Sequence, residues 1–313
     1  MALRIVIGDV TIGIHGQDFS YIFSVGSGGM ESLYKDGKEW LYRAPRPAFW
    51  RAVTDNDRGC GFAFRSAVWS AADRFVRCSR VEVRMDGEEI AIPLAPANNQ
   101  YTGKETCDRF EIIYTYETPT VPATEVTVTY TVETDGRIHV QTEYHGKQGL
   151  PELPVFGMRF LMPTAAERYT YEGLSGETYP DRMAGGIHGV YEVQGLPVTP
   201  YMVPQDCGMH MQTKWLEIVR KTSLDNTDRG GRSSRLKITA EEGKHFAFSC
   251  LPYTAQELEN AMHHEELPPA RRTVVSILGA VRGVGGINSW GADVEDAYHI
   301  SGEQDITYGF WIE

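Results

Sequence analysis

The stretch Thr124-Glu125-Val126-Thr127-Val128-Thr129-Tyr130-Thr131-Val132 decides the fold class of this chain. Apolar and polar residues alternate along it and most are β-branched, which predicts a half-buried antiparallel strand. Asp135-Gly136, a pair typical of a hairpin turn, follows it. Arg137 to Tyr144 then repeats the alternation. The segment therefore predicts a β-hairpin.

Further strand-like segments run through the rest of the chain. They are Arg109 to Tyr116, Arg235 to Ile238, His245 to Cys250, Thr273 to Leu278 and Ile306 to Ile312. Glycine and proline, with 32 and 16 residues, interrupt the segments between them. Many short strands separated by turns indicate an all-β fold, and we expect a large antiparallel sandwich.

We expect only one or two short helices. One helix is predicted by apolar residues at helical spacing, namely Phe64, Ala67, Val68, Ala71, Ala72 and Phe75. Another is predicted by Thr254-Ala255-Gln256-Glu257, which is typical of a capping box. Asp225 to Ser234 is polar and fits a surface loop better than a linker. We therefore expect a single domain over residues 1–313.

Composition excludes several classes of protein. The net charge of −12 argues against a general nucleic-acid binder or a binder of anionic membranes. No apolar run approaches the ~20 residues of a membrane helix, and the N-terminus lacks a secretory signal. The five cysteines are scattered and never in C-x-x-C spacing, so neither disulfides nor a zinc site is indicated. The chain is expected to be cytoplasmic.

The most polar motif is Trp50 to Gly59, in which Asp55-Asn56-Asp57 is followed by Arg58. Unpaired charges are too costly to bury, so we expect a solvated turn, a metal loop or a polar network built for a ligand. The ligand spacing of a calcium loop is absent. A turn whose carboxylates accept backbone hydrogen bonds is an equally good interpretation.

Two other segments could present ligand-binding groups. In Val284 to Gly291, glycines flank Trp290, so the indole could be held outward as a platform for a sugar ring or could pack under its own loop. In Gly173 to Arg182, the neighbouring Asp181 and Arg182 favour a structural ion pair over a ligand-hydroxyl site.

The histidines form no convincing catalytic or metal-binding set. His263-His264-Glu265-Glu266 lacks the i, i+4 spacing that helical metal ligands usually have. No nucleophile elbow, P-loop or dinucleotide-binding glycine motif is present in the sequence. The sequence therefore shows no self-contained catalytic apparatus and no metal site of its own.

Taken in order, the motifs resemble the C-terminal domain of bacterial β-galactosidases of glycoside hydrolase family 2. The similar segments are Gly28 to Leu33, Gly37 to Glu39, Phe49 to Gly59, Gly176-Glu177, Tyr179 to Arg182, Pro204 to Gly208, Gly283 to Gly286 and Asn288 to Trp290. They span nearly the whole chain. Because the chain begins with Met at this domain, it most resembles the small subunit of the two-chain enzymes.

The resemblance implies a β-supersandwich similar to galactose mutarotase and a subunit of a β-galactosidase that hydrolyses terminal β-galactosides such as lactose. The family's two catalytic glutamates, ~5 Å apart in a retaining enzyme, lie on a TIM barrel with magnesium and sodium sites nearby. Those motifs are absent here and are expected on a large partner subunit. No catalytic residue, metal or cofactor is therefore expected in this chain, which alone should be inactive.

Several site residues are implied by the resemblance. Trp290, with Ser289 and Asn288, is similar to the family's substrate platform for the non-galactose sugar. The family usually has Asp where Asn288 stands, which puts an acidic role there in doubt. The segment Asp55, Asn56, Asp57, Arg58 and Gly59 is similar to a mobile loop near the same pocket.

Two other functions remain open. A mutarotase-like sandwich also suits a stand-alone aldose 1-epimerase, which needs a positioned acid and base, typically His and Glu. A carbohydrate-binding or structural module is the other alternative. If the chain covers a larger partner, it should carry an exposed apolar patch when isolated, with possible self-association. Tyr42 to Trp50 is the predicted patch.

Overall fold

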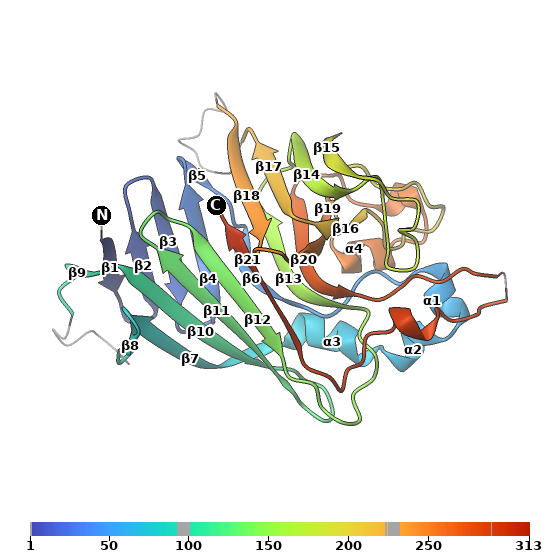
Figure 1. The fold of residues 1–313 in the computed structure, drawn as a ribbon, viewed down its shortest axis with the longest axis horizontal. Helices are drawn as coiled ribbons and strands as arrows, with labels where there is room; N and C mark the ends of the chain where they lie inside the picture. The colour runs from blue at the N-terminus through green and yellow to red at the C-terminus, as the bar shows by residue number, and fades with distance from the viewer. Residues whose placement is uncertain (1, 93–100, 223, 225–231, 289) are drawn as a thin grey trace.

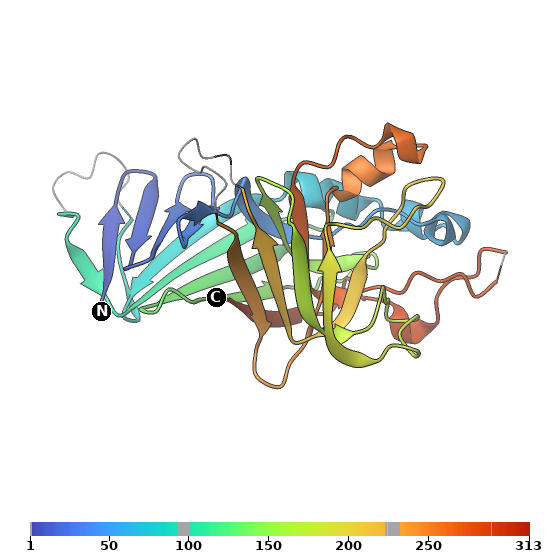
Figure 2. The same cartoon turned by 90° about the horizontal axis from the view of Figure 1, so that it is seen from above.

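The computed structural model describes residues 2–92, 101–222, 224, 232–288 and 290–313. Its strands form three sheets, and every strand pair in them is antiparallel. Figures 1 and 2 both place α1, α2 and the segment after β20 at the end of the molecule opposite the N-terminus. This end carries the candidate site.

The three sheets differ in size. From one edge to the other, the six-stranded sheet contains β5 (Lys38–Glu39), β4 (Gly29–Lys35), β3 (Phe19–Ser24), β2 (Thr11–His15), β1 (Leu3–Ile7) and β9 (Glu105–Cys107). The ten-stranded sheet contains, in the same sense, β15 (His188–Gln194), β14 (Arg168–Leu174), β17 (Trp215–Arg220), β18 (Ser234–Ala240), β21 (Ile306–Ile312), β12 (Ile138–Tyr144), β11 (Glu125–Glu133), β10 (Arg109–Glu117), β7 (Arg77–Met85) and β8 (Glu88–Glu89). The five-stranded sheet contains β16 (Met209–Thr213), β19 (Phe246–Leu251), β20 (Thr273–Val281), β13 (Val155–Met162) and β6 (Arg43–Ala48).

Four short helices lie between the strands in the described part of the chain, so the expectation of only one or two was wrong. They are α1 (Asp55–Gly59), α2 (Phe62–Arg65), α3 (Val68–Phe75) and α4 (Ala255–Asn260), with 3-10 turns at His264–Glu266 and Asp296–Tyr298. Thr254 caps α4, and Glu257 completes the predicted capping box. No helix in the described part of the chain is long and apolar enough to cross a membrane.

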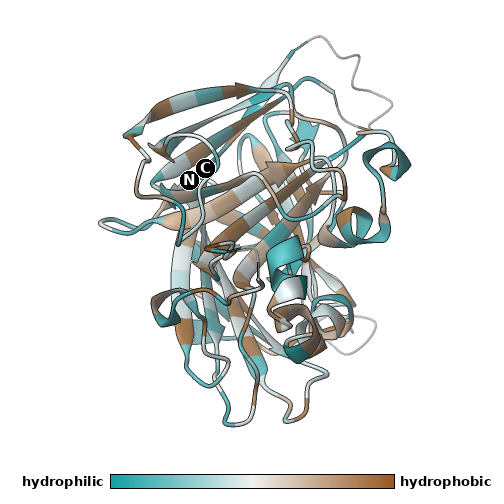
Figure 3. Ribbon diagram, turned by 90° about the vertical axis from the view of Figure 1, so that its right-hand side faces the viewer, coloured by the Kyte–Doolittle hydropathy of each residue, from teal (hydrophilic) through white to brown (hydrophobic). Residues whose placement is uncertain are grey.

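The hairpin that decided the fold class is confirmed as β11 and β12. In β11 the apolar positions Val126, Val128, Tyr130 and Val132 are fully buried, while Thr127 and Thr129 between them are half-buried. Figure 3 shows the same alternation of hydrophobic and hydrophilic bands along many strands. The other predicted strands are also present, as β10, β18, β19, β20 and β21. The all-β class is therefore correct.

One cluster of buried side chains joins residues from all three sheets. Phe23 from the six-stranded sheet contacts Phe110 and Tyr130 from the ten-stranded sheet, with ring centroids 6.0 and 5.5 Å apart. Trp69 on α3 stacks on Phe49 at 5.7 Å. Such aromatic pairs add to the free energy of burial that holds the sheets together.

The prediction of a helix around residues 64–75 was wrong about which residues are buried. The segment forms two helices, and Phe64 and Phe75 are 89% and 67% exposed. The buried residues of α3 are Trp69 and Ala72. The indole of Trp69 is the largest apolar side chain of the segment, and its burial sets how α3 rotates against the core.

The predicted apolar patch at Tyr42 to Trp50 was also wrong. Tyr42 is 58% exposed, but Phe49 and Trp50 are buried. The main-chain amides of both buried residues donate to Asp73 on α3, over 3.0 and 3.3 Å. This segment is therefore part of the core rather than an exposed surface.

The hairpin turn gives the first prediction. Gly136 has a φ of +84°, and a Cβ there would lie 2.5 Å from the Phe19 ring. Gly87 has a similar φ of +85° but no atom within 4 Å of its Cβ position. Gly136→Ala should therefore lower the free energy of unfolding by about 2 kcal/mol or more, and Gly87→Ala by about 1 kcal/mol. Equal losses in a denaturant titration would contradict the steric explanation.

Candidate functional site

Helix α1 forms where the sequence predicted a loop. Thr54 caps it by accepting a hydrogen bond from the Asp57 amide over 3.1 Å. The Asp57 carboxylate in turn accepts the Thr54 amide over 2.9 Å. This reciprocal capping box satisfies two otherwise free donors at the start of a helix. The acidic residues of the motif therefore start a short helix.

Asp57 is buried together with Arg51. The two side chains are 2% and 3% exposed and form a two-pronged ion pair with distances of 2.6 and 3.2 Å. Burial alone would raise the pKa of Asp57, but the Arg51 guanidinium and the hydrogen bonds at Thr54 lower it overall. The expectation that this charged string cannot enter the core was wrong, because the two charges enter it as a pair.

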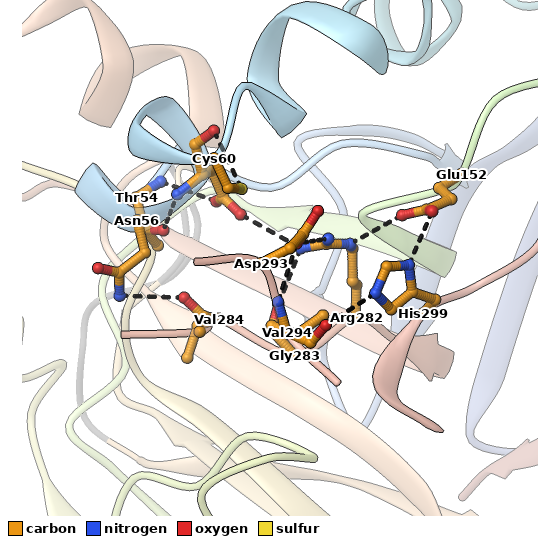
Figure 4. A network of polar contacts seen from close by, with 12 residues as sticks. Thr54, Asn56, Cys60, Glu152, Arg282, Gly283, Val284, Asp293, Val294 and His299 are labelled. Carbon is orange, nitrogen blue, oxygen red and sulfur yellow. Dashed lines mark hydrogen bonds and ion pairs between the residues drawn. The ribbon is translucent and has the colours of Figure 1, made fainter. Parts of the chain in front are cut away.

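Arg282 extends this ion pair into a network (Figure 4). Its guanidinium lies 3.6 Å from Asp57 and 3.2 Å from Glu152, and it also pairs with Asp293. Glu152 is 2.7 Å from His299, whose other ring nitrogen lies 3.0 Å from the Val294 carbonyl oxygen. The network thus ties α1 to both ends of the loop that follows β20.

Asp181 and Arg182 hold the same loop by its backbone. The Asp181 carboxylate accepts the amides of Val284 and Gly285 over 3.0 and 2.7 Å. Arg182 donates to the Gly285 carbonyl over 3.2 Å. The two residues were expected to form an ion pair with each other. Instead, each binds the main chain of the loop.

A direct backbone contact joins α1 to the loop. A Cβ at Gly291, where φ is +77°, would lie 2.6 Å from the Gly59 carbonyl oxygen. The Asn56 side chain donates to the Val284 carbonyl over 3.1 Å. The structure therefore brings the predicted segment 55–59 against the loop that carries Trp290. Such a close approach needs glycine on the loop side.

Trp290 is 92% exposed. The side-chain oxygen of Asn288 accepts the amides of Trp290 and Ala292 over 2.8 and 3.3 Å, so this residue folds the turn that bears the indole. The indole therefore does not pack under its own loop, and its use as a sugar platform stays a prediction. Ser289 lies outside the described residues.

A polar cavity of about 570 Å³ lies beside α1. Its walls include Asp55 and Asn56 of the predicted segment, together with Glu177, Tyr179, Arg182, Tyr201, Gln205 and Asp206. Asp206 is half-buried in the wall of this cavity, and the Tyr179 hydroxyl donates to its carboxylate over 2.8 Å. Burial raises the pKa of Asp206 to about 6, although the Arg51 guanidinium favours its charged form.

Neither His188 nor His210 is hydrogen-bonded to a carboxylate of the described residues. His210 is buried between aromatic rings, stacked on Phe248 at 4.7 Å, and burial lowers its pKa to about 4. His188 is exposed and bonds Gln212 over 2.8 Å. Among the residues that the structure describes, no group of three or more His, Cys, Asp or Glu side chains could hold a metal ion.

Sequence reasoning missed Arg282, Glu152, His299 and Asp206 as members of the site. Asp206 lies within Pro204 to Gly208, one of the segments that resemble the known family, but it was given no role there. Arg282, Glu152 and His299 come from distant parts of the chain, and no local pattern marks them. Only the charge of Arg282, immediately before the glycine-rich loop, could have drawn attention to it.

The fold and the site together define a large antiparallel β-sandwich protein that presents an exposed tryptophan loop beside a buried charge network. The family described as "Beta galactosidase small chain" matches residues 15–312. The chain therefore belongs to this family.

The relatives differ in how much of their length this chain covers. The "Beta-galactosidase small subunit" of Latilactobacillus sakei is 58% identical over 310 residues, with 99% of this chain and 97% of the relative aligned. A "Beta-galactosidase" of Halalkalibacterium halodurans is 35% identical, with 99% of this chain aligned to 28% of the relative. The chain thus spans about a quarter of the latter enzyme.

Solved structures give a more distant likeness. A putative aldose 1-epimerase from Escherichia coli is 10% identical, with 96% of this chain and 97% of the epimerase covered and a TM-score of 0.44. A TM-score below 0.5 at this identity is too low for function to be transferred.

The raised pKa of Asp206 gives a pH prediction. Because the folded-state pKa of about 6 exceeds the ordinary 3.8, the carboxyl stabilises the fold at pH below about 4. That contribution is lost as the pH rises through about 6. Asp206→Asn, which keeps an acceptor for Tyr179, should therefore raise the free energy of unfolding at pH 7.5 by about 1–3 kcal/mol and change it little at pH 4.

Denaturant titrations of the wild type and Asp206→Asn at several pH values measure this difference. A stability difference that is the same at pH 4 and pH 7.5 would show that Asp206 does not titrate between them.

Proposed function

We propose that this chain is the small subunit of a heteromeric β-galactosidase and completes the active site of a large, catalytic subunit. The assembled enzyme hydrolyses terminal β-D-galactosides such as lactose with retention of configuration. This chain contributes the loop of Trp290 and the neighbouring α1, while the large subunit contributes the two catalytic glutamates and the magnesium and sodium sites.

The exposed indole of Trp290 is the observation that carries this proposal. An aromatic side chain that is 92% exposed offers both of its apolar faces to a ligand or a partner. Its loop is fixed at several backbone positions, by Asp181, Arg182 and Asn56. A rigidly held, exposed ring is suited to stack on a sugar.

The interactions of four carboxylates in the site support the proposal that the catalytic pair lies on another chain. A retaining glycosidase needs two carboxyl groups ~5 Å apart that are free to act on the substrate. Here Asp57, Asp293 and Glu152 all pair with arginine, and the Asp181 oxygens accept backbone amides. These groups therefore position the loop rather than attack a glycosidic bond.

A stand-alone aldose 1-epimerase is less well supported. Such an enzyme needs an acid and a base that face its substrate. His210 is buried among aromatic rings, and Glu177 accepts hydrogen bonds from Thr199 and Gly208 over 2.7 and 2.9 Å. A binding module without catalytic involvement is the second candidate, because an exposed indole also suits a module that only binds sugar, although the match to the β-galactosidase small chain family favours the first.

The state of the cysteines supports the expected cytoplasmic location. All five, Cys60, Cys78, Cys107, Cys207 and Cys250, are free thiols, and three of them are buried. Free thiols are the usual state in a reducing compartment.

The proposal predicts that activity depends on assembly. The purified chain should not hydrolyse lactose, whereas the chain co-expressed with its large subunit should do so. Freshly dissolved α-galactose, followed by polarimetry, tests the epimerase alternative on the same samples. Lactose hydrolysis by the purified chain alone would refute the assignment of the catalytic residues to the large subunit. Accelerated mutarotation of galactose would favour the epimerase.

The sugar platform is tested by Trp290→Ala in the assembled enzyme. Loss of a stacking contact of about 1 kcal/mol should raise the KM for lactose about fivefold. Tyr42→Ala, which removes another exposed aromatic ring at 58% exposure, is the matched control and should leave the KM unchanged. An unchanged KM in Trp290→Ala, with normal subunit association in gel filtration, would favour the purely structural module.

A further inference from the structure

A second cavity, of about 490 Å³, is lined by four arginines. Arg43 and Arg46 come from β6, Arg74 from α3 and Arg159 from β13. Ala44, Pro47 and Leu161 supply an apolar part of the wall. Figure 2 shows α3 and α4 near each other, and Gln256 of α4 donates to Asp73 of α3 over 3.3 Å. We call this space the arginine cavity.

Asp73 is the one acidic residue among the described residues that line the arginine cavity. One of its oxygens accepts the amides of Phe49 and Trp50, and the other accepts Arg159 over 2.6 Å and Gln256 over 3.3 Å. Its single negative charge is therefore already matched by Arg159. No carboxylate in the described part of the cavity wall is left for the other three arginines.

Those three arginines have few partners. Arg46 donates to the Ser27 carbonyl over 3.0 Å, and its guanidinium lies 5.6 Å from the Tyr116 ring centroid. Neither Arg43 nor Arg74 makes a hydrogen bond or an ion pair within 4 Å to any described residue. Burial lowers the pKa of Arg43, and the neighbouring guanidinium of Arg159 lowers it further.

This concentration of positive charge is unusual on a chain with a net charge of −12. Arg43 and Arg74 are exposed and Arg46 is half-buried, so water screens part of the repulsion between them, and an oxyanion between the three guanidinium groups would relieve the rest. A planar guanidinium presents paired N–H donors that match two oxygens of one oxyanion, and Arg is the usual residue at such sites.

We propose that the arginine cavity binds a small multivalent oxyanion, such as orthophosphate or the phosphate group of a phosphorylated metabolite. The phosphate lies between Arg43, Arg46 and Arg74, which carry the unmatched charge. The volume also leaves room for a group attached to the phosphate beside Ala44 and Leu161. The site is separate from the residues around Trp290, and only its test, which uses the assembled enzyme, relies on the proposed large subunit.

The test uses the assembled two-chain enzyme and measures phosphate binding by calorimetry at constant ionic strength. The double variant Arg43→Gln/Arg74→Gln removes two unpartnered charges. It should bind orthophosphate at least about tenfold more weakly than the wild type. Without phosphate, its thermal midpoint should equal or exceed that of the wild type, because the arginine repulsion is relieved.

The double variant Arg77→Gln/Arg235→Gln is the matched control. It removes the same charge from exposed arginines that pair with Glu117 and Glu217, over 3.2 and 3.4 Å. Its phosphate affinity should equal that of the wild type. Glucose 6-phosphate is the probe for a phosphorylated metabolite. If it binds more tightly than orthophosphate, the sugar attached to the phosphate also contacts the cavity.

Three outcomes would overturn the proposal. They are no phosphate binding by the wild type, equal phosphate affinity in the wild type and Arg43→Gln/Arg74→Gln, or loss of subunit association in this variant with no change in phosphate binding. The last outcome would mean that the cavity binds an acidic surface of the large subunit instead of phosphate. Gel filtration of the co-expressed chains measures subunit association.

Discussion

The buried ion pair of Arg51 and Asp57 is the interaction on which the candidate site depends. Asp57 also caps α1 through Thr54, so one carboxylate fixes both the start of the helix and its position in the core. Arg51 also donates to the Gly283 carbonyl over 3.3 Å, at the root of the Trp290 loop. Breaking such a pair leaves an uncompensated buried charge, which is why the arrangement is held in one geometry.

The loop after β20 is fixed by its backbone more than by its side chains. Asp181 binds its amides, Arg182 and Asn56 bind its carbonyls, and the close approach of Gly291 to Gly59 locks it against α1. Val284 and Val294 near the two ends of the loop are buried, whereas Ile287 and Trp290 face outward. The backbone contacts of the loop thus keep the Trp290 ring in solvent, away from the surface of the sandwich.

The charges of the molecule are used in two different ways. Around Arg282, three carboxylates surround one guanidinium, and the network is closed within the described part of the chain. In the arginine cavity, the arginines Arg43, Arg74 and their neighbours outnumber the one carboxylate among the described residues of the wall. This excess of positive charge is the basis for the oxyanion site that we propose. The first arrangement builds the loop that we assign to the sugar site, and the second is suited to recognise a ligand.

The sequence alone determined the seven strands β10, β11, β12, β18, β19, β20 and β21, the hairpin and the capping box at Thr254, because alternation and turn chemistry are local properties. It also marked Trp290 and the segment 55–59 through motifs that resemble a known family. Only the tertiary structure decided that Asp57 is buried, that Trp69 sets the rotation of α3, and which distant charges meet at Arg282. Burial and ion pairing depend on neighbours far away in the chain, so no local pattern could reveal them.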